Sequence, residues 1–108
     1  MPIWVCMFDD DEHMLAHRKK WRGEHHAYLR RNSDKILFAG ALLADKNSAP
    51  TGGLWVLDVA GEDEARTLVQ GDPYYDSRHR RFRLQLWKFA LEEFDAKLAN
   101  MALTGDKL

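Results

Sequence analysis

Apolar positions along this chain fall into short continuous runs and longer amphipathic stretches, and their lengths separate strands from helices. The run 3–8 is rich in aromatic and β-branched residues and is too short for a helix, which predicts a strand. Three aspartates at 9–11 then supply turn and N-cap chemistry. Across residues 12–32, apolar positions recur at spacings of three, four and seven, which is typical of an amphipathic helix. Gly23 lowers helix propensity there by about 1 kcal/mol, so we expect a loose start and a firm helix from about Arg22.

The remaining pattern predicts strands over 36–44 and 54–59, a helix over 62–70, a strand over 80–90 and a helix from 91 to about 101. The order βαββαβ is that of the ferredoxin-like fold, an α+β arrangement with a four-stranded antiparallel sheet. We therefore expect one domain over residues 1–90 and a C-terminal helical extension over residues 91–108.

The expected strands are apolar on both faces. In the run 3–8, odd-numbered and even-numbered positions point to opposite sides of the sheet, and both sets are apolar. Two helices can cover one of these faces. The other face then requires a partner, and the sheet of a second copy is the simplest one, so we expect a homodimer that forms through the sheet faces.

Composition narrows the classes of function. The 108 residues are 45% apolar and 31% charged with a net charge of -1, so the chain lacks the basic surface that nucleic acid requires. A single cysteine, Cys6, excludes an intramolecular disulfide and suits a reducing compartment. The first residues do not resemble a signal peptide, and no run approaches the roughly 18 apolar residues of a membrane helix. We expect a cytoplasmic protein with no nucleic-acid or membrane partner.

Two short motifs carry the candidate chemistry, one at residues 22–29 and one at residues 71–74. His25 lies on the same helical stripe as Tyr28 and therefore faces inward, where its ring needs a hydrogen-bond partner. Asp72 is a candidate partner for proton transfer. From the residues alone, a core histidine that is satisfied for structural reasons is the favoured interpretation, and only the family resemblance described below favours proton transfer instead.

Asp72 also precedes Pro73, which is the pattern of a helix N-cap followed by proline at the first helical position. The two roles are compatible if one carboxylate oxygen caps the helix while the other faces His25. As a partner of His25, the carboxylate would orient the imidazole and stabilise its charged form. The opposite assignment, in which Asp72 takes the substrate proton, stays open.

Other reactive side chains favour plainer interpretations. His26 lies about 100° around the helix from His25 and is expected at solvent or at a subunit interface. His13 and His17 have a spacing that binds metal on a helix, but no third ligand is evident, so we expect a solvated face and no metal site. Cys6 alternates into a strand and is expected to be a buried small apolar residue.

A basic cluster occupies residues 78–83 and includes Arg80. A solvated strand edge is the expected setting, with a local role in binding an anionic substrate, since arginine pairs well with carboxylates. No glycine-rich nucleotide motif or metal signature is present, so no cofactor is expected.

Four motifs in order resemble the YciI-like family of YCII-related domains, over nearly all of residues 1–90. They are Arg22-Gly-Glu-His25-His26-Ala-Tyr28-Leu29, Phe38-Ala39-Gly40, the glycine-led strand at 51–57, and a helix with Glu64-Ala65 that ends in Asp72-Pro73-Tyr74. The resemblance implies a dimeric α/β barrel in which His25 and Asp72 form a His–Asp active site. Some members of this family are similar to enzymes that eliminate halide from precursors of aromatic ring cleavage.

The chain departs from the family pattern in two places. Gly53 stands where relatives often have a small hydroxyl residue, which removes a polar contact from the pocket, and residues beyond about 90 form the extension. The resulting hypothesis is a cofactor-free enzyme with His25 as general acid or base and Asp72 as its partner. Its substrate is a small anionic or cyclic molecule, which undergoes elimination (such as dehydrochlorination) or isomerisation. The candidate substrate-binding residues are Arg22, Tyr28 and Tyr74.

Two alternatives come from fold analogy. Related barrels include cofactor-free monooxygenases and haem-binding enzymes, and the same fold also serves as a non-catalytic small-molecule-binding or assembly module. A binding module predicts that ligand binding survives His25→Ala and that no turnover occurs.

Overall fold

The computed structural model describes the backbone of residues 2–107 and the side chains of residues 2–101. The elements follow in the order β1 (Ile3–Asp10), α1 (Met14–Arg31), β2 (Ile36–Leu42), β3 (Gly52–Asp58), α2 (Glu62–Gly71), β4 (Arg80–Leu86) and α3 (Glu93–Lys107). This order confirms the predicted βαββαβ arrangement and the C-terminal helix. None of the described helices is long and apolar enough to cross a bilayer.

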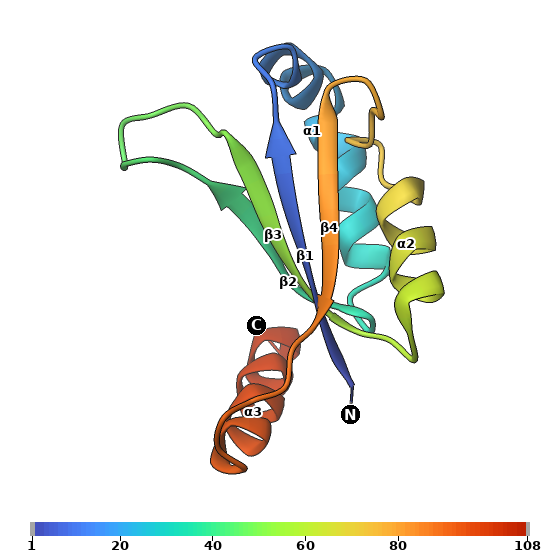
Figure 1. Cartoon of the computed structure of the whole chain (residues 1–108), viewed down its shortest axis with the longest axis vertical. Coiled ribbons are helices and arrows are strands. Elements are labelled where there is room, and N and C mark those ends of the chain that lie inside the picture. The colour runs from blue at the N-terminus through green and yellow to red at the C-terminus, as the bar shows by residue number, and fades with distance from the viewer. Residues whose placement is uncertain (1, 108) are drawn as a thin grey trace.

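The four strands form one antiparallel sheet in the order β2-β3-β1-β4. Cys6 in the central strand β1 lies opposite Trp55 of β3 on one side and Leu84 of β4 on the other. Helices α1 and α2 lie together on one face of this sheet, whereas α3 projects from the end of β4 (Figure 1). The architecture is the predicted α+β ferredoxin-like fold.

The core lies between the sheet and the helices α1 and α2. Cys6 and Leu57 are completely buried, and burial of a leucine side chain contributes about 1.5–3 kcal/mol. The buried cluster consists of Cys6, Phe8, Ile36, Trp55, Leu57, Val59, Ala65, Leu68 and Val69. Because residues that lie opposite each other in an antiparallel pair share a face, the cluster members from β1 are both even-numbered (Cys6, Phe8) and those from β3 are both odd-numbered (Trp55, Leu57).

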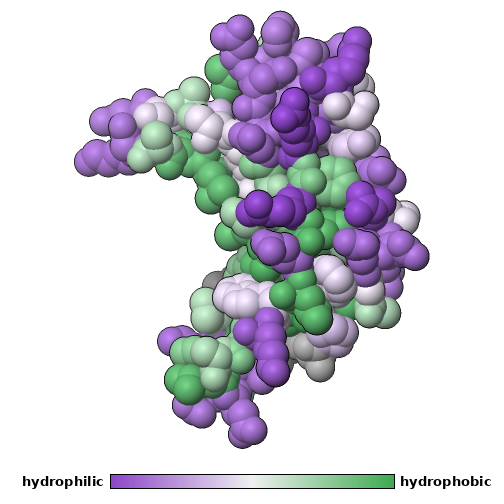
Figure 2. All heavy atoms as spheres, viewed as in Figure 1, coloured by the Kyte–Doolittle hydropathy of each residue, from purple (hydrophilic) through white to green (hydrophobic). Residues whose placement is uncertain are grey.

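The opposite face of the sheet is apolar and incompletely covered, as the alternation in the sequence predicts. Met7, Phe38 and Leu42 are each nearly 40% exposed there. Helix α3 approaches one end of this face, where a cavity of about 600 Å³ separates it from Phe38 and Val56. Hydrophobic residues gather in the hollow between the β2–β3 hairpin and α3 (Figure 2).

The expected loose start of the first helix is wrong, because α1 is continuous from Met14 to Arg31. Gly23 is exposed and has open space around its Cα. Its low helix propensity is therefore the main way in which it lowers the stability of the helix. The buried side chains of Met14 and His25 hold the helix on both sides of Gly23. Tertiary packing therefore overrides local propensity.

Of the aspartates at 9–11, Asp11 forms the expected turn, but the expected helix cap is wrong. Strand β1 continues to Asp10, and the N-cap of α1 is His13, with no side-chain cap hydrogen bond. Asp11 accepts a hydrogen bond from the backbone N–H of His13 at 2.9 Å. The side chain of Asp10 is buried, at 1% exposure.

Several boundaries differ from the prediction. Strand β2 ends at Leu42 rather than at residue 44, and β3 begins two residues early at Gly52. Strand β4 ends at Leu86 instead of continuing to residue 90, and α3 continues to Lys107. The backbone N–H of Trp87 still donates to the carbonyl of Ile3, after which the chain leaves the sheet.

Candidate active site

His25 and Asp72 meet across the interface between α1 and the end of α2. The Nδ1 atom of His25 lies 2.7 Å from Oδ1 of Asp72, which is the length of a charge-assisted hydrogen bond. The residues are 9% and 4% exposed, respectively. The structure thus brings together the two residues that the sequence paired, although 47 positions separate them.

The side chain of Asp72 caps a turn and not the start of a helix. It is the C-cap residue of α2, and its Oδ1 accepts a hydrogen bond from the backbone N–H of Tyr74 at 3.2 Å. No helix begins at Pro73, because residues 73–79 form turns that lead into β4, so the N-cap expectation is wrong. The same oxygen contacts His25 and the turn, whereas Oδ2 is buried without a hydrogen-bond partner among the described residues. The turn therefore fixes the carboxylate in the position that His25 requires.

Tyr74 completes this arrangement. Its ring stacks on the imidazole of His25 with a centroid distance of 3.7 Å and an interplanar angle of 7°. Tyr74 is 4% exposed, so the stack restricts the imidazole in a largely dry setting. The turn at Asp72 and Pro73 places both the carboxylate and the aromatic ring against His25.

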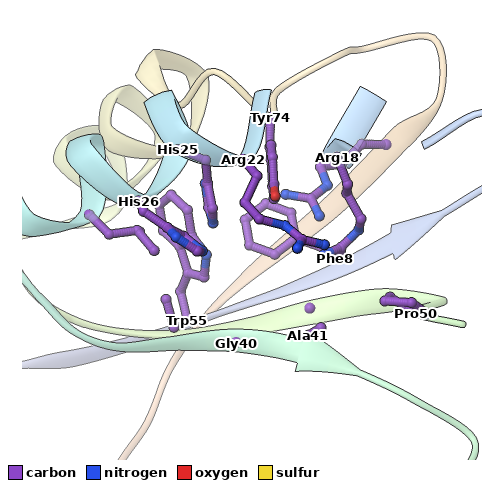
Figure 3. A pocket seen from close by; sticks show the side chains of 14 residues that line it. Phe8, Arg18, Arg22, His25, His26, Gly40, Ala41, Pro50, Trp55 and Tyr74 are labelled. Atoms are coloured by element: carbon purple, nitrogen blue, oxygen red, sulfur yellow. The ribbon is translucent and has the colours of Figure 1, made fainter. Parts of the chain in front are cut away.

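A cavity of about 320 Å³ lies between this group and the sheet (Figure 3). His25 and His26 descend into it from α1, and Tyr74 lies between His25 and Arg18. Its lining residues are Phe8, Arg18, Arg22, His25, His26, Leu29, Ala39, Gly40, Ala41, Pro50, Gly53, Trp55, Tyr74 and Arg80. Because Nδ1 of His25 is used by Asp72, Nε2 is the ring nitrogen left for a molecule in the cavity.

Asp10 joins two arginines at the edge of this cavity. Arg80 donates from Nε and Nη2 to the two oxygens of Asp10 at 2.8 and 3.0 Å. Arg18 donates from Nη2 to Oδ2 of the same carboxylate at 3.1 Å and to the carbonyl of Gly52 at 2.8 Å. One buried carboxylate therefore serves two guanidinium groups that line the cavity.

The candidate substrate-binding residues do not share one location. Arg22 and Tyr74 line the cavity, whereas Tyr28 faces α2 and donates its hydroxyl to the carbonyl of Leu68 at 2.6 Å. Burial and the negative charge of Asp72 raise the pKa of Tyr28. A Cβ atom at Gly71 would lie 2.7 Å from the Tyr28 hydroxyl, so the glycine makes room for this contact. Tyr28 therefore contacts helix α2, and its hydroxyl is already engaged.

Sequence reasoning missed Arg18, and the solvated setting expected for the basic cluster is wrong for Arg80, which is buried at 4% exposure. The signal for Arg18 was present: it precedes Arg22 by four positions and so continues the stripe that contains His25 and His26. His26 is exposed, as expected, and also lines the cavity. No pattern in the sequence marked Asp10 as the shared partner of the two arginines.

Small residues form the sheet side of the cavity. A Cβ atom at Gly53 would lie 3.0 Å from the carbonyl oxygen of Gly40 and 3.4 Å from the ring of Phe8. Gly53 lines the cavity and brings no hydroxyl to it. The floor at this point is therefore backbone, with Trp55 and Phe8 as neighbouring aromatic walls.

The other three histidines, His13, His17 and His79, take no part in the contact between His25 and Asp72. His17 and His13 do not form a pair, because Nε2 of His17 lies 2.9 Å from the carbonyl oxygen of Pro73 and His13 stacks on His79 at 4.5 Å. Asp11 joins His13 and His79 to give three potential metal-ligand atoms within 4.8 Å of one another. This cluster is mostly exposed and does not line the cavity.

Cys6 is completely buried, as the sequence predicts. Burial raises the pKa of its thiol to about 12, so the side chain is a neutral thiol at physiological pH. It packs in the core and is not a lining residue of the cavity.

The comparisons with known proteins agree with this fold. The chain is similar to the solved structure of 5-chloro-2-hydroxyhydroquinone dehydrochlorinase (TftG) from Burkholderia phenoliruptrix AC1100 in complex with 2,5-dihydroxybenzoquinone. The TM-score is 0.70 at 22% sequence identity, over 82% of this chain and 95% of that chain. No curated protein matches the sequence. The YCII-related domain matches residues 3–88, so this chain belongs to the family of YCII-related domain proteins.

Proposed function

We propose that this protein is an enzyme that transfers a proton on a small cyclic organic molecule, in an elimination or an isomerisation. His25 is the general acid or base, and Asp72 orients it. The observation that carries this proposal is the 2.7 Å contact between the two side chains, with His25 at the wall of a cavity of about 320 Å³ that has room for a small ring. Histidine changes charge near neutral pH, which suits it to proton transfer.

In this proposal each ring nitrogen of His25 has its own role. The Nδ1–H donates to the Asp72 carboxylate, which fixes the tautomer and leaves the Nε2 lone pair for the substrate. In an elimination, Nε2 accepts a proton from the substrate, the electron pair left behind forms a double bond, and halide leaves. The imidazolium that results is stabilised by Asp72, while the stack with Tyr74 holds the ring in place.

The fold relative supports the choice of reaction class. TftG is named for removal of hydrogen chloride from a small hydroxylated ring, and its structure holds a second ring compound. A cavity of about 320 Å³ with Phe8 and Trp55 in its walls is suited to a molecule of this kind. Elimination from a hydroxylated or halogenated ring is therefore the first reaction to test.

The test is chloride release from 5-chloro-2-hydroxyhydroquinone by the purified protein, with wild type compared to His25→Asn and Asp72→Asn. We expect turnover by wild type and a loss of about 10²–10⁴-fold in kcat for His25→Asn, the usual contribution of a general acid or base. His13→Asn is the matched control, since His13 is exposed and does not line the cavity. Equal rates for wild type and His25→Asn contradict the proposal.

Binding without turnover leads to a different conclusion. If 2,5-dihydroxybenzoquinone binds to wild type and to His25→Asn alike and no ring substrate is converted, the domain is a small-molecule-binding module. Intrinsic fluorescence provides the binding signal, because Trp55 lines the cavity.

A further inference from the structure

We infer that the cavity binds ring compounds that carry a negatively charged oxygen, and that Arg18 and Arg22 bind this oxygen. The class comprises phenolates, enolates and ring carboxylates. Binding of the anion requires no turnover, so this part of the inference is independent of the proposed function. Only the orientation of the molecule, with its reacting end at His25, rests on the proposed function.

The first observation is an imbalance of charge. Three arginines line the cavity, namely Arg18, Arg22 and Arg80. Asp10 is shared between Arg18 and Arg80, and Asp72 is engaged with His25 and the Tyr74 backbone. The described carboxylates at the cavity therefore leave positive charge uncompensated, which a bound anion would neutralise.

Arg80 is not the source of this excess charge. Its Nε and Nη2 atoms form a two-point contact with Asp10, and its side chain is 3% exposed. The guanidinium also lies 4.3 Å from the ring centroid of Phe8. Arg80 is thus closed in by its partners, and its role is to hold Asp10 in position.

Arg18 is incompletely satisfied. Both of its hydrogen bonds come from Nη2, whereas Nε is buried without a partner among the described residues. A buried donor without an acceptor is unfavourable. Nε itself has no surface open to the cavity, so an oxygen anion would meet the exposed part of the guanidinium. The side chain is 13% exposed, so a small ligand reaches it without displacing the core.

Arg22 supplies the second cation. It follows Arg18 by one helical turn, is exposed, and has no ion pair with any residue whose side chain is described. Two adjacent guanidinium groups offer a fork of donors that suits the oxygens of a phenolate or carboxylate. The pair therefore forms a site for one oxygen anion.

Tyr74 links this site to the reacting end. Its ring contacts the imidazole of His25 at 3.7 Å, and the Arg18 guanidinium lies 5.5 Å from the same ring centroid. The imidazole and the guanidinium are separated by no more than these two distances together. Tyr74 itself lies between the two groups (Figure 3), so a six-membered ring with an oxygen substituent would lie beside Tyr74 in the cavity, with its oxygen toward arginine and a ring carbon toward His25.

The experiment measures binding of two probes by titration calorimetry: 2,5-dihydroxybenzoquinone, which is an anion at neutral pH, and its uncharged dimethyl ether. We expect the anion to bind to wild type at least 10-fold more tightly than the ether. Arg18→Gln and Arg22→Gln should each weaken binding of the anion about 10-fold or more and leave binding of the ether unchanged. Higher salt should also weaken binding of the anion more than binding of the ether.

Arg30→Gln is the matched control, since Arg30 is an exposed arginine on α1 that does not line the cavity. It should bind the anion as wild type does. If Arg18→Gln does not fold, Arg22→Gln alone decides, because Arg22 is exposed. Equal affinity of wild type and Arg22→Gln for the anion overturns the inference, as does failure of wild type to bind the anion at millimolar concentration. Charge-dependent binding without chloride release instead supports the anion site and contradicts the proposed enzyme.

Discussion

The imidazole of His25 lies flat against the phenol ring of Tyr74, with a centroid distance of 3.7 Å and an angle of 7° between the planes. The backbone N–H of Tyr74 donates to the same oxygen of Asp72 that contacts His25. Three residues from two segments therefore form one rigid unit, in which the turn at residues 72–74 supports the imidazole from two directions. Changes in any member should affect the others.

Removal of both members of the His25–Asp72 pair should cost less than the sum of the two single removals. His25→Ala leaves the buried Asp72 carboxylate without its partner, and loss of one side of a buried pair costs about 3–5 kcal/mol. The double variant His25→Ala/Asp72→Ala removes the unpaired charge as well, so its loss should be smaller than the sum of the two single losses. Urea unfolding of the four proteins measures this, with His26→Ala as an exposed control. Additive losses would show that the pair is not coupled.

Asp10 should be far more important for stability than its neighbour Asp9. Asp10→Asn removes the charge that Arg18 and Arg80 share, and we expect a loss of about 3–5 kcal/mol in the free energy of unfolding. Asp9→Asn is the matched control on an exposed position of the same strand, with an expected change within about 0.5 kcal/mol. Thermal and urea unfolding compare them, and similar losses would contradict the buried cluster.

Substitution by alanine should raise the free energy of unfolding at Gly23 and lower it at Gly52. Gly23→Ala adds a methyl group in open space on an exposed helix position and should stabilise the protein by about 0.5–1 kcal/mol. Gly52→Ala places its methyl group against the backbone carbonyl of Phe8, which the paired strand cannot easily avoid, so a loss of about 1–3 kcal/mol or more is expected. Urea unfolding measures both. Destabilisation by Gly23→Ala would indicate a special role for that glycine.

The uncovered apolar face of the sheet should hold two copies together. Light scattering should give a mass near twice 12.6 kDa for wild type, and Met7→Glu should shift it to the monomer, because the carboxylate would be buried in the interface. Leu15→Glu is the control, since Leu15 is 42% exposed but lies on α1. A monomeric wild type, or a Met7→Glu variant that stays dimeric, would contradict association through this face.

The thiol of Cys6 should be unreactive until the protein unfolds. Burial raises its pKa from 9.0 to about 12, so the folded state retains the proton over a range where the unfolded chain loses it. The free energy of unfolding should therefore fall as pH rises from about 9 toward 12, by at most about 1.4 kcal/mol per pH unit. Cys6→Ala lacks this contribution, so the pH slopes of the two proteins should differ. Rapid labelling of the native thiol by an aromatic disulfide at pH 8 would contradict the burial.

The sequence determined the local features of this protein. Alternation and helical spacing depend on neighbouring residues, which is why the strands, the helices and the inward direction of His25 were predictable. The continuity of α1 through Gly23 was not predictable from the sequence, because the packing of Met14 and His25 outweighs the low helix propensity of one residue.

The tertiary structure decided which side chains meet. The contact of Asp72 with His25 depends on how α2 packs beside α1. The hydrophobic periodicity of the sequence does not specify how two helices pack against each other. Asp10 resembled a cap in sequence, but strand pairing brings Arg80 beside it, and the packing of α1 brings Arg18. Tyr28 shared the stripe of His25, yet a shift of three positions turns its hydroxyl toward Leu68 and away from the cavity. Long-range contacts of this kind arise from strand register and helix packing, which local sequence does not specify.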